Sequence, residues 1–541
     1  MFAVADKWQE RAAELLVVLL LCIQPLYLNA ERYINLTWHK FLFFVVCMCF
    51  VIAAVIAVWA YRITRDPRLT PRSGLSIADC AVLCFAAVTI ISALFSPFKR
   101  DVNVWVGIPE PDGRYDGAIT QLLYVAAYFI ISRWYKPRTR DFVIFGASSV
   151  LVSAIGILQF YGMDFLKLWP VDRVDYRVPN LYEIFFRSTL GNVDIVSTYV
   201  CVAVLLCGFL FVRGSKPKLR PLWLAGSALN FWLMELAGAD SGRIGVLAAV
   251  ILALVFIVEN PETLGRFVIL GVSWIAVYSL QKLLYNVNVL GERTVQSLLP
   301  YAGAALALIV IGLLLIVLPT RRDGKTLVAP LTVSEAQDAG AGSKGVRILN
   351  NGEARESPVK WKLGVLLTVV FIAAAVCGVE VLGKREAETE NPGRIYEMRE
   401  VLHGNLSDEL ATYRIYIWRH ALSVFPEHPI IGSGPDTFPN VFPEDAQGIV
   451  GEHYDKAHNE YLQILICQGI LGLVCYLVFL GAVLVKSVPG SFRDPVKMAV
   501  IAAFAGYCVQ AFFNISLPIA SQMLWVFAGM LSRPERAGST A

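Results

Sequence analysis

Residues 41–60 read FLFFVVCMCFVIAAVIAVWA, a continuous apolar run without a charged or amide side chain. A helix of this length spans roughly 30 Å, which is the thickness of the hydrocarbon core of a bilayer. A helix at the surface of a soluble protein would interrupt such a run with polar residues along its water-facing side. The stretch therefore predicts a membrane-spanning helix.

Similar apolar runs recur along the 541 residues of the chain, of which 56% are hydrophobic and 17% charged. A soluble chain carries about 25% charged residues, so the composition excludes a soluble protein. We predict an all-α fold, a polytopic bundle of about 12–14 transmembrane helices. The last two spans meet around Leu517-Pro518 and could instead form a re-entrant pair. The predicted spans are 11–30, 41–60, 76–95, 118–134, 142–162, 193–212, 221–237, 244–258, 266–283, 300–318, 363–381, 459–485, 497–513 and 516–531.

Basic residues in the short loops predict the orientation of the chain, because cytoplasmic loops are enriched in Lys and Arg. With a cytoplasmic N-terminus, three successive inner loops each carry four basic residues, and the C-terminus is also cytoplasmic. The polar outer segments are longer and more acidic. The three inner clusters are Arg62, Arg65, Arg68 and Arg72; Arg133, Lys136, Arg138 and Arg140; and Arg213, Lys216, Lys218 and Arg220.

Composition along the chain predicts five segments. A stretch rich in Gly, Ala, Ser and charge, without apolar periodicity, is typical of a flexible cytoplasmic loop. The segments are 1–180, the N-terminal helices; 181–318, the first part of a transmembrane core; 319–362, the cytoplasmic insert; 363–458, a helix with a large extracytoplasmic loop; and 459–541, the C-terminal helices and a short tail.

The long outer loop, residues 382–458, contains a predicted amphipathic helix over residues 412–425. Helical spacing places Ile415, Trp418, Leu422 and Phe425 on one face of that helix, which favours a position at the membrane surface. Pro426 and Pro429 follow and end the helix, and the next residues form a tight turn.

Outer residues of two kinds suit chemistry on a phosphorylated substrate. Gly238-Ala-Asp-Ser-Gly-Arg243 places an arginine at the mouth of one span, and Ala457-His-Asn places His458 at the mouth of another. Arginine keeps its charge and matches phosphate oxygens with a planar fork, and histidine can accept a proton from a hydroxyl. Taken one at a time, interfacial arginines more often bind lipid headgroups, and a lone histidine at a helix end is more often a cap or a surface residue.

Four motifs in this order resemble the O-antigen ligase / O-antigen polymerase superfamily, and the resemblance covers about residues 180–530. Arg187-Ser-Thr-Leu-Gly-Asn192 also resembles a Gly-Asn-Pro-Asn segment of that family, with Val193-Asp194 in place of Pro-Asn. The four motifs are Asp240-Ser-Gly-Arg-Ile-Gly245, Arg414-Ile-Tyr-Ile-Trp-Arg-His-Ala421, Pro429-Ile-Ile-Gly-Ser-Gly-Pro-Asp-Thr-Phe438 and His458-Asn-Glu-Tyr-Leu-Gln463.

The resemblance assigns roles to six residues. His458 matches the family's essential histidine, and Arg243 and Arg414 match its pyrophosphate-binding arginines. Arg187, Arg419 and Arg114 are auxiliary candidates; Arg114 lies in Pro111-Asp-Gly-Arg-Tyr-Asp-Gly117, where a solvated turn is an equal alternative. For Arg419, a contact with a lipid headgroup is an equal alternative.

The resemblance implies a glycosyltransferase of the GT-C type in the bacterial inner membrane, with an extracytoplasmic active site. Such enzymes move a glycan from undecaprenyl pyrophosphate to a hydroxyl with inversion, and the ligases need no metal or cofactor. The acceptor is a lipid, a growing glycan or a protein in different members, so polymerase and protein oligosaccharyltransferase activities are alternatives. A polysaccharide or lipid transporter is the non-enzyme alternative. Membrane lipids are expected partners and nucleic acids are not.

Overall fold

The computed structural model describes residues 2–65, 74–110, 113–161, 163–168, 188–257, 261–289, 358–389, 393–448, 454–489 and 494–533. All regular secondary structure in these ranges is helical, which confirms the predicted all-α membrane bundle. Seven of the described helices are long and apolar enough to cross a membrane. These are α3 (Leu36–Arg65), α4 (Ile77–Phe95), α7 (Thr139–Phe160), α9 (Val193–Arg213), α12 (Pro261–Val289), α18 (Glu460–Ser487) and α19 (Pro495–Gln510).

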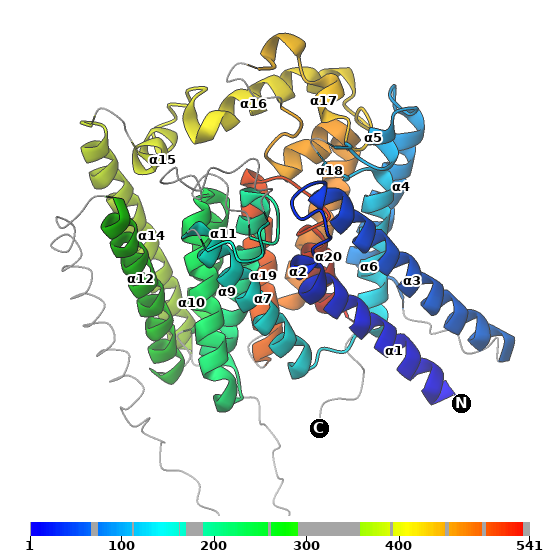
Figure 1. Cartoon of the computed structure of the whole chain (residues 1–541), viewed down its shortest axis with the longest axis horizontal. Helices are drawn as coiled ribbons and strands as arrows, with labels where there is room; N and C mark the ends of the chain where they lie inside the picture. The colour runs from blue at the N-terminus through cyan, green and yellow to red at the C-terminus, as the bar shows by residue number, and fades with distance from the viewer. Residues whose placement is uncertain are drawn as a thin grey trace, which may run out of the picture.

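Helix α9 is the core of the bundle, and its residues from Ile195 to Val212 are all buried. It packs against α10, α11 and α19, which surround it in Figure 1. Where α11 meets α19, a Cβ on Gly245 would lie 2.7 Å from the carbonyl oxygen of Gly506. Small residues thus let these backbones approach closely, as in other membrane helix pairs. The other large helices are α1 (Phe2–Val18), α6 (Ala118–Trp134), α10 (Arg220–Ala237), α11 (Asp240–Ile257), α14 (Pro358–Glu386) and α20 (Gln522–Leu531).

The first predicted span, 11–30, is interrupted. Helix α1 continues through a π-helical turn, Leu19–Ile23, into α2 (Gln24–Leu26) and ends there. The ammonium group of Lys40 donates to the carbonyl oxygens of Gln24 and Pro25 at 2.7 and 3.0 Å. These bonds satisfy carbonyl groups at the broken end of the helix, where the backbone supplies no partner.

Two further spans differ from their predicted form. The last one, 516–531, is helical only over α20, because residues 514–521 form a buried loop. Helix α18 is kinked at Gly469, whose φ is +69°. The carbonyl groups of Pro429 and Ile430 accept hydrogen bonds from Ile470 and Leu471 just beyond this kink. The kink therefore holds the turn at Pro429 and Ile430 in place.

The described parts of the long loop that the sequence predicts to be extracytoplasmic form a layer over one end of the bundle (Figure 1). Helix α15 (Arg394–Leu402) leads from α14 to α16 (Leu410–Val424), and the short α17 (Phe438–Val441) precedes α18. The predicted amphipathic helix is present, and it ends as expected before Pro426. Tyr416, Ile417 and Ala421 are buried within the protein, whereas Leu422, on the face predicted to meet the membrane surface, is 52% exposed. The buried residues pack against the loop that follows the helix.

Two predicted segments cannot be compared in full with the structure. The span 300–318 and most of the insert 319–362 lie outside the described residues. Helix α14 begins at Pro358, so the end of the predicted insert is helical.

Candidate functional site

His458 lies in the turn that leads into α18, and its backbone has a φ of +48°, rare for a residue with a side chain. Three neighbouring contacts fix the turn. The indole of Trp418 donates to the carbonyl of Ala457, and the amide of Ala457 donates to the side chain of Gln463, both at 3.0 Å. The side chain of Asn459 caps α18. Strained backbone held in this way clusters at functional sites.

The imidazole of His458 is half-buried, and its Nδ1 has no hydrogen-bond partner among the described residues. Burial lowers the pKa of His458, and the charges of Arg414 and Arg114 lower it further. The carboxylates of Asp194 and Asp455 act in the opposite direction. The net effect is a lowered pKa, so the ring is neutral at pH 7 and able to accept a proton.

Those four charged groups form two ion pairs beside the histidine. Arg114, from the loop before α6, pairs with the buried carboxylate of Asp455. Arg414, on α16, lies 3.9 Å from the carboxylate of Asp194 in the first turn of α9. We call these five residues the His458 cluster. The structure thus brings together three of the residues predicted from sequence: His458, Arg414 and Arg114.

Arg414 is incompletely paired. One terminal nitrogen donates to the carbonyl of Ala411 at 3.0 Å. Its Nε is buried and has no hydrogen-bond partner in the described part of the chain. A buried donor without a partner costs about 1–3 kcal/mol, so an anionic ligand at this position would be favourable.

Arg243, at the start of α11, is paired with protein carboxylates. It contacts Glu235 at 3.0 Å and Asp240 at 2.8 Å. Asp240 also pairs with Arg394 of α15, which donates to the hydroxyl of Thr412 at 3.0 Å. Arg243 is therefore linked to the start of the helix that carries Arg414, through a chain of ion pairs.

A second link runs through Asn514 in the loop before α20. Its amide lies 2.9 Å from the carbonyl oxygen of Asp194 and 3.1 Å from the hydroxyl of Ser241, two residues before Arg243. Ser197 of α9 accepts from the amide of Gly242 at 3.0 Å. These hydrogen bonds hold the N-terminal ends of α9 and α11 together, so Arg243 lies at the same end of the bundle as the His458 cluster.

The two remaining auxiliary candidates are placed differently. Arg419 is 58% exposed and pairs with Asp408 at 2.7 Å, in the loop before its own helix. The groups whose charges act on His458 do not include it. Arg187 lies outside the described residues.

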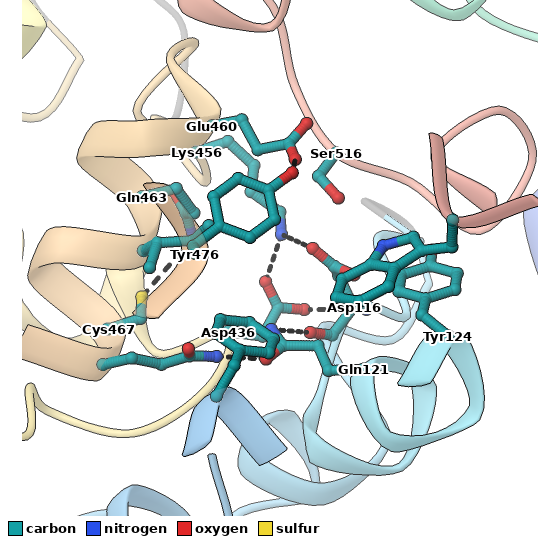
Figure 2. Close-up of a pocket in the computed structure, with 14 residues that line it drawn as sticks. Asp116, Gln121, Tyr124, Asp436, Lys456, Glu460, Gln463, Cys467, Tyr476 and Ser516 are labelled. Atoms are coloured by element: carbon teal, nitrogen blue, oxygen red, sulfur yellow. Dashed lines mark hydrogen bonds and ion pairs between the residues drawn. The ribbon is translucent and has the colours of Figure 1, made fainter. Parts of the chain in front are cut away.

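Sequence reasoning missed a second group of ionisable residues close to the first along the chain. Lys456 is buried and pairs with Asp436 and, at 3.7 Å, with Asp116. Glu460 accepts from the hydroxyl groups of Tyr476 and Tyr507 nearby. Figure 2 shows Asp116, Asp436, Lys456 and Glu460 converging on one cavity from different segments. We call these four residues the Lys456 cluster.

The cavity of the Lys456 cluster leaves about 30 Å³ for the centre of a water molecule, room for about two waters. Burial raises the pKa of Asp116 to about 7. Burial alone would lower the pKa of Lys456, but Asp436 and Asp116 raise it, so the lysine is charged. The sequence offered one signal for this cluster: Asp116, Asp436 and Glu460 each lie within a motif quoted in the sequence analysis. Among the described residues, no group of three or more His, Cys, Asp or Glu side chains could hold a metal ion.

The fold and the site define a multi-pass membrane protein with arginines and a neutral histidine gathered at one end of the bundle. The family model described as O-Antigen ligase matches residues 225–477, which include Arg243, Arg414 and His458. The resemblance to the O-antigen ligase / polymerase superfamily is therefore confirmed. No curated protein matches the chain. The family implies ligase-like or polymerase-type glycosyl transfer, with a lipid-linked donor and an acceptor in the membrane.

Proposed function

We propose that the protein transfers a glycan from undecaprenyl pyrophosphate to an acceptor hydroxyl, in the manner of an O-antigen ligase, on the outer face of the bacterial inner membrane. The observation that carries the proposal is that one cluster contains two buried atoms without a hydrogen-bond partner among the described residues, Nε of Arg414 and Nδ1 of His458. The first suits a phosphate oxygen, and the second suits a hydroxyl proton. Both termini of the chain are then cytoplasmic, as the basic loops predict.

The transfer needs two things from the protein. Negative charge grows on the pyrophosphate as its bond to the anomeric carbon breaks, and the guanidinium groups of Arg414 and Arg114 stabilise that charge. Arg243 is a further pyrophosphate ligand in this proposal, after exchange of its carboxylate partners. The neutral imidazole of His458 takes the proton of the attacking hydroxyl. In-line attack opposite the departing phosphate inverts the anomeric centre, and none of these steps calls for a metal ion.

The proposal is tested with purified protein in lipid nanodiscs and a lipid-linked glycan donor. We expect His458→Ala to lower the transfer rate about 10²–10⁴-fold, the usual contribution of a positioned general base. The matched control is His403→Ala, because His403 is also on the outer layer but is 43% exposed and pairs with Glu380. Full activity in His458→Ala would contradict the assignment.

The identity of the acceptor distinguishes a ligase from a polymerase, and the glycan that accumulates in a deletion strain reports it. A strain that lacks a ligase accumulates polymerised glycan on its lipid carrier, whereas loss of a polymerase leaves single repeat units. Accumulation of single units would replace the ligase proposal by the polymerase one.

A further inference from the structure

The two carboxylates of the His458 cluster have no role in the transfer described above. Asp194 and Asp455 come from different segments, α9 and the turn before α18, yet each pairs with an arginine that the donor would use. The charges of both carboxylates also act to raise the pKa of His458. Without a bound donor, the two carboxylates therefore interact with both arginines and with the histidine.

We propose that Asp194 and Asp455 are positioning residues that hold Arg414 and Arg114 until the donor pyrophosphate replaces them, after which the released carboxylates stabilise the protonated form of His458. This inference rests on the proposed function. Donor binding would then prepare the base, so that the donor binds before the acceptor reacts.

The charges of the cluster support this exchange. Two arginines and two aspartates balance in the described structure, with a neutral histidine. A bound pyrophosphate adds negative charge that the arginines compensate, and the aspartates are left without counter-ions. The imidazolium that forms when the acceptor hydroxyl gives up its proton then restores part of the balance, because a nearby carboxylate favours the charged form of histidine.

The geometry also allows the exchange at Arg414. Its contact with Asp194, at 3.9 Å, is at the outer limit of an ion pair, and its buried Nε is unused. The guanidinium can therefore bind a phosphate oxygen without first losing a close hydrogen bond to the carboxylate. Arg114 is held more tightly, since its partner Asp455 is only 5% exposed.

The protons and electrons of the step balance. The acceptor oxygen forms a bond to the anomeric carbon while its proton moves to the imidazole of His458. The bond from the anomeric carbon to the phosphate oxygen breaks, and its electron pair remains on the pyrophosphate. The imidazolium, held by Asp194 and Asp455, afterwards releases the proton to water or to the departing pyrophosphate.

The test compares Asp194→Asn and Asp455→Asn with the wild-type protein. Asp408→Asn is the matched control, because Asp408 pairs with Arg419 at an exposed outer position. The probe for binding is farnesyl pyrophosphate, measured by calorimetry, and transfer is measured with the lipid-linked donor. Thermal unfolding reports whether each variant folds. Because Asp194 is only half-buried, we expect Asp194→Asn to disturb folding less than Asp455→Asn.

We expect each site variant to bind the probe about threefold to tenfold more tightly, because the arginine is no longer shared. Its kcat should fall about tenfold and its KM for the donor should also fall. Loss of a carboxylate lowers the pKa of His458 further, so the acidic limb of kcat/KM should move to lower pH. A merely structural role would lower kcat with a higher KM and no such movement.

The outcomes separate the inference from the proposed function. Unchanged or weaker probe binding in both variants, with normal transfer by the wild-type protein, overturns the inference alone. Absence of transfer by the wild-type protein, with measurable probe binding, overturns the proposed function. The binding comparison then still decides whether the carboxylates compete for the arginines.

Discussion

The His458 cluster and the Lys456 cluster begin two residues apart in the chain, yet they differ in how their charges are satisfied. In the Lys456 cluster the lysine side chain is 2% exposed, and its ammonium group lies between two buried carboxylates. In the His458 cluster the histidine and Arg414 are half-buried, and each has a buried nitrogen without a hydrogen-bond partner in the described part of the chain. In the Lys456 cluster the buried atom without such a partner is a carboxylate oxygen of Asp116. In the first arrangement the cation lies between two carboxylates, whereas in the second Arg414 and His458 each keep a nitrogen available to a ligand.

This difference indicates a structural role for the Lys456 cluster and a chemical role for the His458 cluster. Lys456 connects the loop before α6, through Asp116, with the turn before α17, through Asp436. Asp436 also accepts from the backbone amide of Ile108 at 2.9 Å. We infer that the Lys456 cluster fixes the turn and that the His458 cluster uses the resulting geometry. Substitutions in the two clusters should therefore affect different measurements.

The largest effect on stability is expected for Lys456→Met. It leaves Asp436 and Asp116 buried without their cation, and breaking a buried ion pair from one side costs about 3–5 kcal/mol. The thermal unfolding midpoint in nanodiscs should fall markedly, and transfer should fall with the folded fraction.

The matched control is the double variant Lys456→Met/Asp436→Asn, which removes both charges of the closest pair. We expect it to recover part of the lost stability, since the carboxylate no longer needs a counter-ion. An unchanged midpoint in Lys456→Met would show that the cluster does not hold the turn.

Apolar runs in the sequence predicted most of the described helices, although not the breaks in the spans 11–30 and 516–531. Apolar runs report helices directly, because the bilayer requires them to be long and continuous. The burial of Lys456 could not be predicted from the sequence, because nothing in the pattern around a loop lysine indicates that it is buried. The side of α16 that packs within the protein could not be predicted, because Tyr416 and Ile417 pack on a loop that comes later in the chain. Partners that come from distant segments, such as Asp194 for Arg414, depend on tertiary structure.

A smaller effect, confined to activity, is expected for Arg414→Lys. The charge remains, but the planar fork that bonds two phosphate oxygens is lost. We expect about a tenfold to hundredfold higher KM for the donor, since hydrogen bonds to charged groups contribute about 1.5–3 kcal/mol. Arg419→Lys on the same helix is the control and should leave KM unchanged, because Arg419 is bound to Asp408. Equal effects at both positions would mean that α16 needs basic residues only for lipid contact.

The smallest effect is expected for Tyr507→Phe, which removes a single hydrogen bond from the Lys456 cluster. The tyrosine hydroxyl donates to Glu460 at 3.1 Å, and Tyr476 donates to the other carboxylate oxygen. Because Glu460 keeps that second partner, the loss should be about 1 kcal/mol of stability, seen as a slightly lower unfolding midpoint. The transfer rate should not change, since the bond lies outside the His458 cluster. A fall in transfer with an unchanged midpoint would show instead that Glu460 takes part in the reaction, and that the two clusters act as one site.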